Sequence, residues 1–133
     1  ASVYNKKEFK AFKKEMKNFH KKIESQSEKK SRKKMFVLKF VGDIKASWVD
    51  KFREEVTTVL TTVTPQDEVV ILIESPGGIV HGYGLAASQM ERIRNRGINL
   101  TVIVDKVAAS GGYLMACVAD KIIAAPFAII GSI

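Results

Sequence analysis

Apolar residues recur along the chain at two spacings, and the change between them separates a first helix from a larger body. Near the start, every third or fourth residue is apolar among many lysines, which predicts an amphipathic helix over residues 4–30. The apolar stripe of this helix consists of Phe9, Phe12, Met16, Phe19 and Ile23. Polar residues follow and indicate a linker. We therefore divide the chain into a tail, residues 1–34, and a body, residues 35–133.

The body alternates short, continuous apolar runs with longer stretches of helical spacing. This pattern predicts strands over residues 35–41, 68–73, 98–104 and 121–124, helices over 46–63, 80–95 and 110–119, and a loop over 105–109. In the helix 80–95 we expect Leu85, Met90 and Ile93 to face the core. Strands that are apolar on both faces and alternate with helices are typical of an α/β fold with a largely parallel sheet and flanking helices.

Charge is distributed unevenly between the two parts. The chain has 133 residues and a net charge of +8. The tail carries thirteen Lys and Arg against four Glu, whereas the body carries nine basic against ten acidic residues. A domain that binds nucleic acid carries basic residues on its folded face, so this distribution argues against a nucleic-acid partner. The basic tail helix would instead lie on an anionic membrane surface or pack against a partner protein.

The apolar runs and the single cysteine narrow the class of protein. No apolar run reaches the ~18 residues of a membrane-spanning helix. Cys117 can form no internal disulfide and no metal site made of thiolates alone, and its apolar surroundings predict a buried side chain.

Two glycine-rich turns follow neighbouring predicted strands. Glu74-Ser75-Pro76-Gly77-Gly78 comes after the strand 68–73, and Ala108-Ala109-Ser110-Gly111-Gly112 comes after the strand 98–104. Parallel strands end at the same edge of a sheet, so we expect the two turns to meet there. Glycine N–H groups can face open space and hold a phosphate or an oxyanion. The phosphate-loop pattern is absent, and an ordinary strand-to-helix turn remains the alternative.

Ser110 has two interpretations from the residues alone. It could cap the helix that follows it, or it could be a nucleophile beside the glycine turns. A serine nucleophile needs a base, and the candidates within the chain are His20, His81, Lys106 and Lys121. None of their positions predicts a buried group directed at Ser110.

Four motifs, in this order and at these spacings, resemble the signal peptide peptidase A family, and the resemblance is closest to its SohB branch. They are Glu74-Ser75-Pro76-Gly77-Gly78, Ala108-Ala109-Ser110-Gly111-Gly112-Tyr113, Ala119-Asp120-Lys121-Ile122 and Gly131-Ser132-Ile133. The resemblance covers residues 35–133. It implies a crotonase-like spiral fold, shared with the Clp protease, of which this chain would hold the N-terminal part.

The same resemblance implies a serine peptidase with a Ser–Lys dyad. Ser110 falls on the nucleophile, and Gly77, Gly78 and Gly111 fall on the oxyanion hole. Ser132 falls on a serine that positions the lysine, and the lysine itself would lie beyond Ile133, so the chain alone is expected to be inactive.

The family also implies a setting for this peptidase. It would hydrolyse peptides from signal sequences or membrane proteins without metal or cofactor, as a homo-oligomer. A single-pass anchor before the basic tail would hold it at the bacterial inner membrane, with the catalytic domain on the periplasmic side.

Two other functions stay open from the sequence. A crotonase-like acyl-CoA enzyme would use the same paired N–H groups without needing Ser110. A non-catalytic scaffold would use the basic tail to bind a membrane or a partner.

Overall fold

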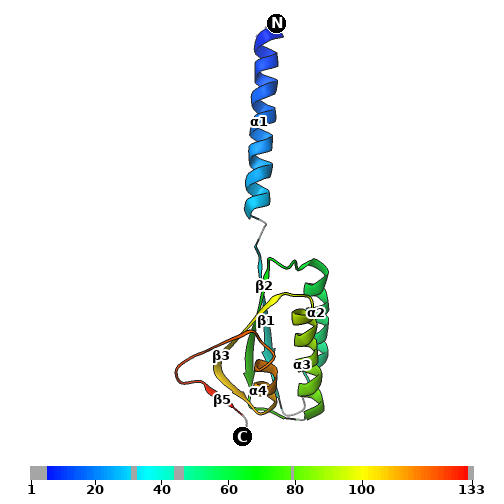
Figure 1. Ribbon diagram of the computed structural model, residues 1–133, viewed down its shortest axis with the longest axis vertical. Coiled ribbons are helices and arrows are strands. Elements are labelled where there is room, and N and C mark those ends of the chain that lie inside the picture. Colours follow the sequence, from blue (N-terminus) through cyan, green and yellow to red (C-terminus); the bar gives the residue numbers. More distant parts are fainter. Residues whose placement is uncertain (1–5, 31–32, 44–46, 79, 132–133) are drawn as a thin grey trace. The chain divides into compact units, whose positions relative to one another are not determined.

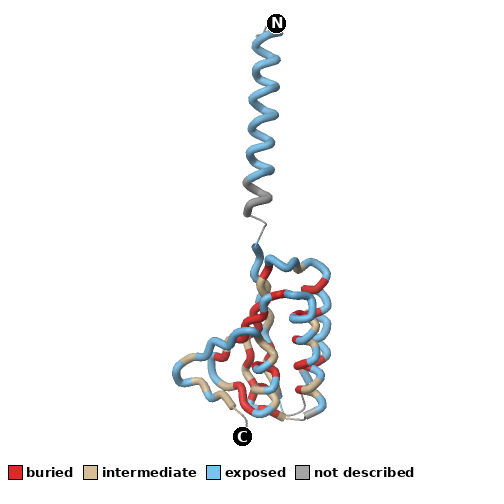
Figure 2. The backbone as a smooth tube through the Cα atoms, in the orientation of Figure 1, coloured by how far each residue is buried: buried red, intermediate tan, exposed pale blue. Residues whose placement is uncertain are grey.

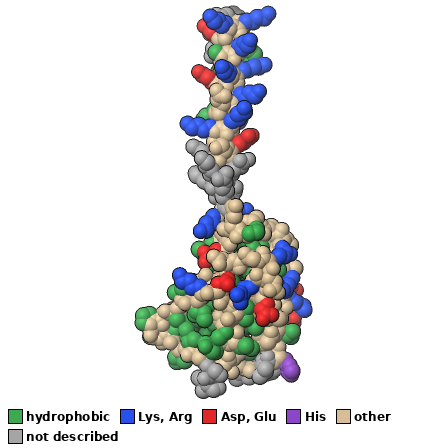
Figure 3. All heavy atoms as spheres, in the orientation of Figure 1, with side chains coloured by type: hydrophobic (Ala, Val, Ile, Leu, Met, Phe, Trp, Pro, Cys, Tyr) green, Lys and Arg blue, Asp and Glu red, His purple; other side chains and the backbone are tan. Residues whose placement is uncertain are grey.

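The computed structural model describes residues 6–30, 33–43, 47–78 and 80–131, and its contacts divide the chain into two units, residues 1–33 and 34–133. The first unit is the helix α1, Lys6–Lys30. The five stripe residues of α1 are all exposed, between 42% and 58%, and basic side chains project from the helix on the face shown in Figure 3. No helix in the described part of the chain is long and apolar enough to span a membrane.

The second unit is built on a parallel sheet of five strands. These are β1 (Met35–Val41), β2 (Glu68–Ser75), β3 (Asn99–Ala109), β4 (Lys121–Ala124) and β5 (Ile129–Gly131). Strands β1 to β4 are neighbours in chain order, and β5 pairs with the end of β3. The β-branched residues of β2 and β3 favour extended backbone and fill the centre of the sheet.

Three helices flank this sheet: α2 (Val49–Thr62), α3 (Val80–Asn95) and α4 (Gly111–Ala116). Helices α2 and α3 lie side by side along one face of the sheet (Figure 1). Buried residues line that face and the inward sides of the helices (Figure 2), and the largest include Phe40, Phe52, Ile71, Tyr83 and Met90. The predicted α/β class, with a parallel sheet and flanking helices, is confirmed.

The side of α3 that faces the core differs from the prediction. Met90 and Ile93 are buried as expected. The prediction for Leu85 is wrong, because its side chain is 57% exposed. The buried residues of α3 are Tyr83, Ala86, Ala87, Met90 and Ile93. These residues share one side of the helix, and the ring of Tyr83 is fully buried there.

The predicted loop 105–109 is also wrong, because β3 continues through it to Ala109. Its last residues find two partners: Ala108 pairs with Ser75 of β2, and Val107–Ala109 pair with β5, which the apolar pattern did not predict. Two further predictions after the end of β3 are wrong. Helix α4 begins at Gly111 and ends at Ala116, so it is shorter than the predicted helix 110–119. Cys117, just after α4, is exposed and not buried.

A buried carboxylate joins the start of β1 to the turn before β2. Asp67 accepts hydrogen bonds from the N–H of Lys34 (2.8 Å), the N–H of Thr64 (2.8 Å) and the hydroxyl of Thr64 (3.0 Å). The Lys34 N–H bond, followed by the Thr64 N–H bond, holds the pKa of Asp67 below its ordinary value of 3.8.

We expect Asp67→Asn to lower stability at neutral pH, because an amide presents only one acceptor oxygen to these donors. The folded-state pKa is depressed, so the stability from the carboxylate is fully present above the ordinary value of 3.8 and is lost as pH falls through the lowered pKa. Thermal unfolding should therefore separate the two proteins at neutral pH and bring them together in acid. Asp50→Asn is the matched control, since Asp50 is exposed; an equal loss there would contradict the prediction.

Candidate active site

The two glycine-rich turns meet at the carboxyl ends of β2 and β3. Ser75 and Ala108 are register partners, and the turn that follows each strand lies beside the other. Contact is close enough that a Cβ added to Gly112 would come within 2.9 Å of the Ser75 Cβ. The edge therefore brings Ser110 and the Gly77-Gly78 turn together, as the strand order predicts.

Ser110 has an unusual backbone conformation. Its φ is 51° and its ψ is −115°, and it is the one non-glycine residue with positive φ in the described part of the chain. Such conformations cost about 1–3 kcal/mol and persist only where surrounding contacts impose them. Here the Ser110 N–H donates to the carbonyl oxygen of Gly131 in β5 (2.9 Å), and its carbonyl oxygen accepts from the N–H of Leu114 (3.0 Å).

The Ser110 hydroxyl is not used as a helix cap. Ser110 occupies the position before α4, but its side chain makes no capping hydrogen bond. The residue is exposed, and its Oγ lies on the side of Gly77, 3.2 Å from the position that a Cβ on that glycine would take. A strained backbone at a serine that makes no capping hydrogen bond is typical of a nucleophile on a tight strand-to-helix turn.

Gly77 lies directly against Ser110. An added Cβ would come within 2.6 Å of the Ser110 Cβ and 3.0 Å of the Ala109 carbonyl oxygen, and the φ of Gly77 is +95°. Only glycine satisfies both conditions. The Gly77 N–H donates to the Ser75 Oγ (3.2 Å).

The N–H groups of Gly78 and Gly111 have no hydrogen-bond acceptor among the described residues. The Gly77 carbonyl oxygen lies 3.4 Å from the buried Tyr83 hydroxyl. No peptide bond is cis in the described residues, and the N–H of a trans peptide points opposite to its C=O. The Gly78 N–H, in the same peptide unit, therefore points away from the core.

The candidate bases within the chain lie elsewhere. The Lys106 Nζ lies 3.8 Å from the Glu74 carboxylate, with both side chains partly exposed. His81 and Lys121 are exposed, and His20 belongs to α1 in the other unit. None of the four has a hydrogen bond to Ser110 within the described residues. Ser132 lies outside them.

Sequence reasoning missed a buried pair behind the turns, Ser75 and Tyr83. The Ser75 Oγ donates to the Tyr83 Oη (2.6 Å), and that hydroxyl donates to the Asp43 carbonyl oxygen (2.8 Å). Burial raises the pKa of the Tyr83 hydroxyl, so it stays protonated and can donate. The helical spacing of residues 83, 86, 87, 90 and 93 could have revealed Tyr83 as a core residue.

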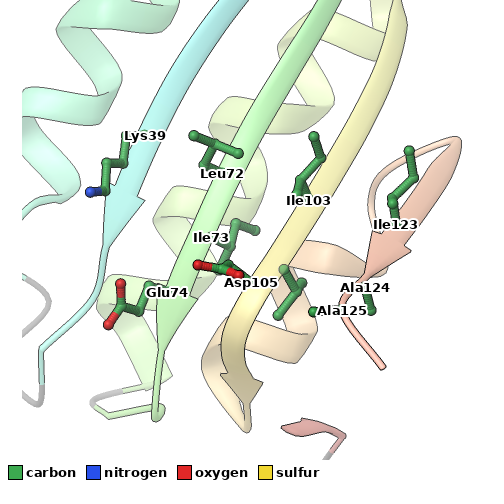
Figure 4. A pocket seen from close by; sticks show the side chains of 10 residues that line it. Lys39, Leu72, Ile73, Glu74, Ile103, Asp105, Ile123, Ala124 and Ala125 are labelled. Carbon is green, nitrogen blue, oxygen red and sulfur yellow. The ribbon is translucent and has the colours of Figure 1, made fainter. Parts of the chain in front are cut away.

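A pocket of about 400 Å³ opens on the sheet face away from the helices. Figure 4 shows Lys39, Leu72, Ile103 and Ile123 projecting into it from four adjacent strands, with Glu74 and Asp105 at one end. Ser110 and the glycines of the two turns do not line this pocket, whereas Glu74, at the start of the first turn, does. Apolar side chains also gather over the part of the domain that contains β4 and β5 (Figure 3), where Phe127 and Ile129 are exposed.

No group of three or more His, Cys, Asp or Glu side chains that could hold a metal ion occurs within the described ranges. The described residues place the exposed Ser110 and the unbonded N–H groups of Gly78 and Gly111 at this edge of the sheet.

Known proteins share this chain's sequence over most of its length. The probable protease SohB of Haemophilus influenzae is 62% identical over 99 residues, which are 74% of this chain and 28% of that protein. The probable protease SohB of Buchnera aphidicola subsp. Acyrthosiphon pisum is 59% identical over 105 residues, 79% of this chain and 31% of that protein. The chain thus spans less than a third of the length of these relatives.

A solved structure shares the fold. It is the 1510-N membrane-bound stomatin-specific protease, a lysine-to-alanine mutant in complex with a substrate peptide. It is 22% identical with a TM-score of 0.59, and the match covers 74% of this chain and 44% of that one.

Two family profiles divide the sequence between them. The profile described as peptidase family S49 N-terminal matches residues 1–90, and the profile described as peptidase family S49 matches residues 92–133. Together with the SohB relatives, these matches confirm the resemblance found in the motifs and show that the chain belongs to peptidase family S49.

Proposed function

We propose that the full-length protein is a serine peptidase and that Ser110 is its nucleophile. The observation that carries this proposal is the conformation of Ser110. The structure holds it at a φ of 51° against Gly77, yet the residue is exposed and its hydroxyl makes no capping bond. A serine held at such cost is best explained by the use of its Oγ in chemistry.

The oxyanion hole would consist of the Gly78 and Gly111 N–H groups. Both lack an acceptor among the described residues, and the Gly78 N–H points away from the core. The Gly77 N–H is engaged by Ser75, so we assign Gly77 a different part: it leaves room for Ser110. Removing one donor of such a hole typically costs about 10²–10³ in kcat.

The base would be a lysine beyond Ile133, with Ser132 positioning its amine. No described His or Lys is bonded to Ser110, and in the 1510-N complex with a substrate peptide a lysine had been replaced by alanine. The lysine replaced in that substrate complex supports a Ser–Lys dyad. The 133-residue chain by itself is then expected to be inactive.

Hydrolysis would proceed through an acyl-enzyme. The Ser110 Oγ attacks the scissile carbonyl carbon while its proton passes to the neutral lysine amine, and the carbonyl oxygen becomes an oxyanion held by the two N–H groups. The C–N bond breaks, and the leaving amine takes the proton from the lysine. A water molecule then gives its proton to the lysine and attacks the ester, and the return of that proton to Oγ releases the acid.

The substrate would be a peptide of signal sequences or membrane proteins, bound extended beside the Gly77-Gly78 turn by strand addition. The exposed stripe and lysines of α1 favour a place next to an anionic membrane surface. We accordingly propose an anchored, homo-oligomeric enzyme of the bacterial inner membrane with its catalytic domain on the periplasmic side.

Covalent labelling tests the nucleophile directly. A fluorophosphonate probe should add to Ser110 in the full-length protein, and mass spectrometry of the peptides locates the adduct. Ser88→Ala is the matched control, because Ser88 is an exposed serine whose hydroxyl bonds only its own helix. Labelling should persist there and disappear in Ser110→Ala. An adduct that survives in Ser110→Ala would show that another residue is the nucleophile.

A further inference from the structure

The Tyr83 side chain contacts three segments around Ser110. Its ring lies against Gly111, since a Cβ at that residue would overlap the ring, and it packs edge-on to Phe40 with centroids 6.0 Å apart. Its hydroxyl reaches the backbone of Asp43 after β1 and of Gly77 after β2. The residue is fully buried, so water cannot replace these contacts.

The hydrogen bonds around this hydroxyl have a fixed direction. A backbone N–H can only donate and a carbonyl oxygen can only accept. The Gly77 N–H therefore donates to Ser75, the Ser75 hydroxyl donates to Tyr83, and the Tyr83 hydroxyl donates to the Asp43 carbonyl. The Tyr83 hydroxyl hydrogen has two carbonyl oxygens within reach, that of Asp43 at 2.8 Å and that of Gly77 at 3.4 Å, so it is shared between them.

Both peptide units of Gly77 are held by these hydrogen bonds. Its N–H is held by Ser75, and its carbonyl oxygen lies 3.4 Å from the Tyr83 hydroxyl. The Gly77 carbonyl and the Gly78 N–H form one planar unit, so the direction of the first sets the direction of the second. A rotation of the Gly77 carbonyl away from Tyr83 would turn the Gly78 N–H away from the site.

We propose that Tyr83 is a positioning residue whose hydroxyl, with Ser75, fixes the Gly77 peptide and thereby aims the Gly78 N–H at the oxyanion. This inference rests on the proposed peptidase function. It assigns Tyr83 no contact with substrate. Its effect should appear on the transition state, where the oxyanion forms, and little on binding of the substrate.

Tyr83→Phe in the full-length protein tests the inference, because it removes the hydroxyl and keeps the ring. We expect kcat for peptide cleavage to fall about 10- to 100-fold, the scale of a displaced catalytic group, with KM close to wild type. Fluorophosphonate should still label Ser110 to completion. Ser75→Ala should lower kcat similarly, and the double variant should be no worse than either single one, because both act through one chain.

Thr101→Val is the matched control for a general loss of stability. Thr101 is buried in β3, and its hydroxyl donates to Glu68 (2.8 Å) far along the strand from Ser110. It should lower the melting temperature without lowering kcat. If Tyr83→Phe kept the wild-type kcat, the positioning role would be overturned. It would also be overturned if Thr101→Val lowered kcat as much as Tyr83→Phe does. In both cases Ser110→Ala would remain inactive, so the proposed nucleophile would stand. Full activity in Ser110→Ala would instead overturn the proposal that Ser110 is the nucleophile.

Discussion

Peptide cleavage by the full-length protein is expected to fall by about 10⁴-fold or more when Ser110 is replaced by alanine, because the covalent step is lost and only binding and the oxyanion donors remain. The Ser110 hydroxyl makes no capping hydrogen bond, so its removal should leave the fold nearly unchanged. Steady-state cleavage of an apolar peptide measures the first effect, and thermal unfolding measures the second.

Ser110→Gly separates chemistry from backbone strain. Both variants should be inactive, but glycine adopts a φ of 51° freely, so it should be more stable than the alanine variant by about 1–3 kcal/mol. A serine that performs no chemistry would be expected to have relaxed or to have been replaced by glycine. Substantial cleavage in either variant would remove Ser110 from the mechanism.

Gly77→Ala is expected to damage both stability and activity. The new Cβ would lie 2.6 Å from the Ser110 Cβ, and a φ of +95° is unfavourable for any side chain. Overpacking and backbone strain together cost about 2–6 kcal/mol. The new Cβ would touch Ser110, so any backbone shift that relieves the contact moves the proposed nucleophile. The cleavage rate should therefore fall even where the variant still folds.

Two other glycines distinguish the causes. Gly97 also has a positive φ, +74°, but open space around its Cβ position, so Gly97→Ala should show strain alone, about 1 kcal/mol, with normal cleavage. Gly84 lies within α3 with nothing nearby, and Gly84→Ala should stabilise the helix by about 0.5–1 kcal/mol. Chemical unfolding of the three variants measures their free energies of unfolding and so ranks their stabilities. A Gly77→Ala protein as stable as Gly97→Ala would show that contact with Ser110 is unimportant.

Local patterns were sufficient for most of the fold. The apolar runs of β2 and the helical spacing of α2 depend on nearby residues, and their bounds agree closely with the structure. The end of β3 was missed because Asp105 and Lys106 interrupt its apolar run. Both are exposed, and the strand continues because Ala108 pairs with Ser75 and Ala109 with Gly131, residues distant in sequence.

Part of the candidate site could also be predicted from the sequence, and part could not. Ser110 and the glycine turns were found from motifs, and strand order alone placed them at one edge. The sequence left the cap interpretation of Ser110 open, and the φ of Ser110 and its missing cap bond, which support the proposed nucleophile, are three-dimensional facts. Tyr83 was missed because its importance arises from contacts with Ser75, Gly77 and Asp43, which come from two other loops.

The hydrogen bond from Ser110 to Gly131 makes the conformation of the serine depend on a strand that follows it in the chain. The Ser110 N–H has this acceptor only while β5 pairs with the end of β3. Local unfolding of β5 would remove the acceptor and let Ser110 relax to an ordinary backbone conformation. We therefore expect Ser110 to keep its φ of 51° only while β5 stays paired.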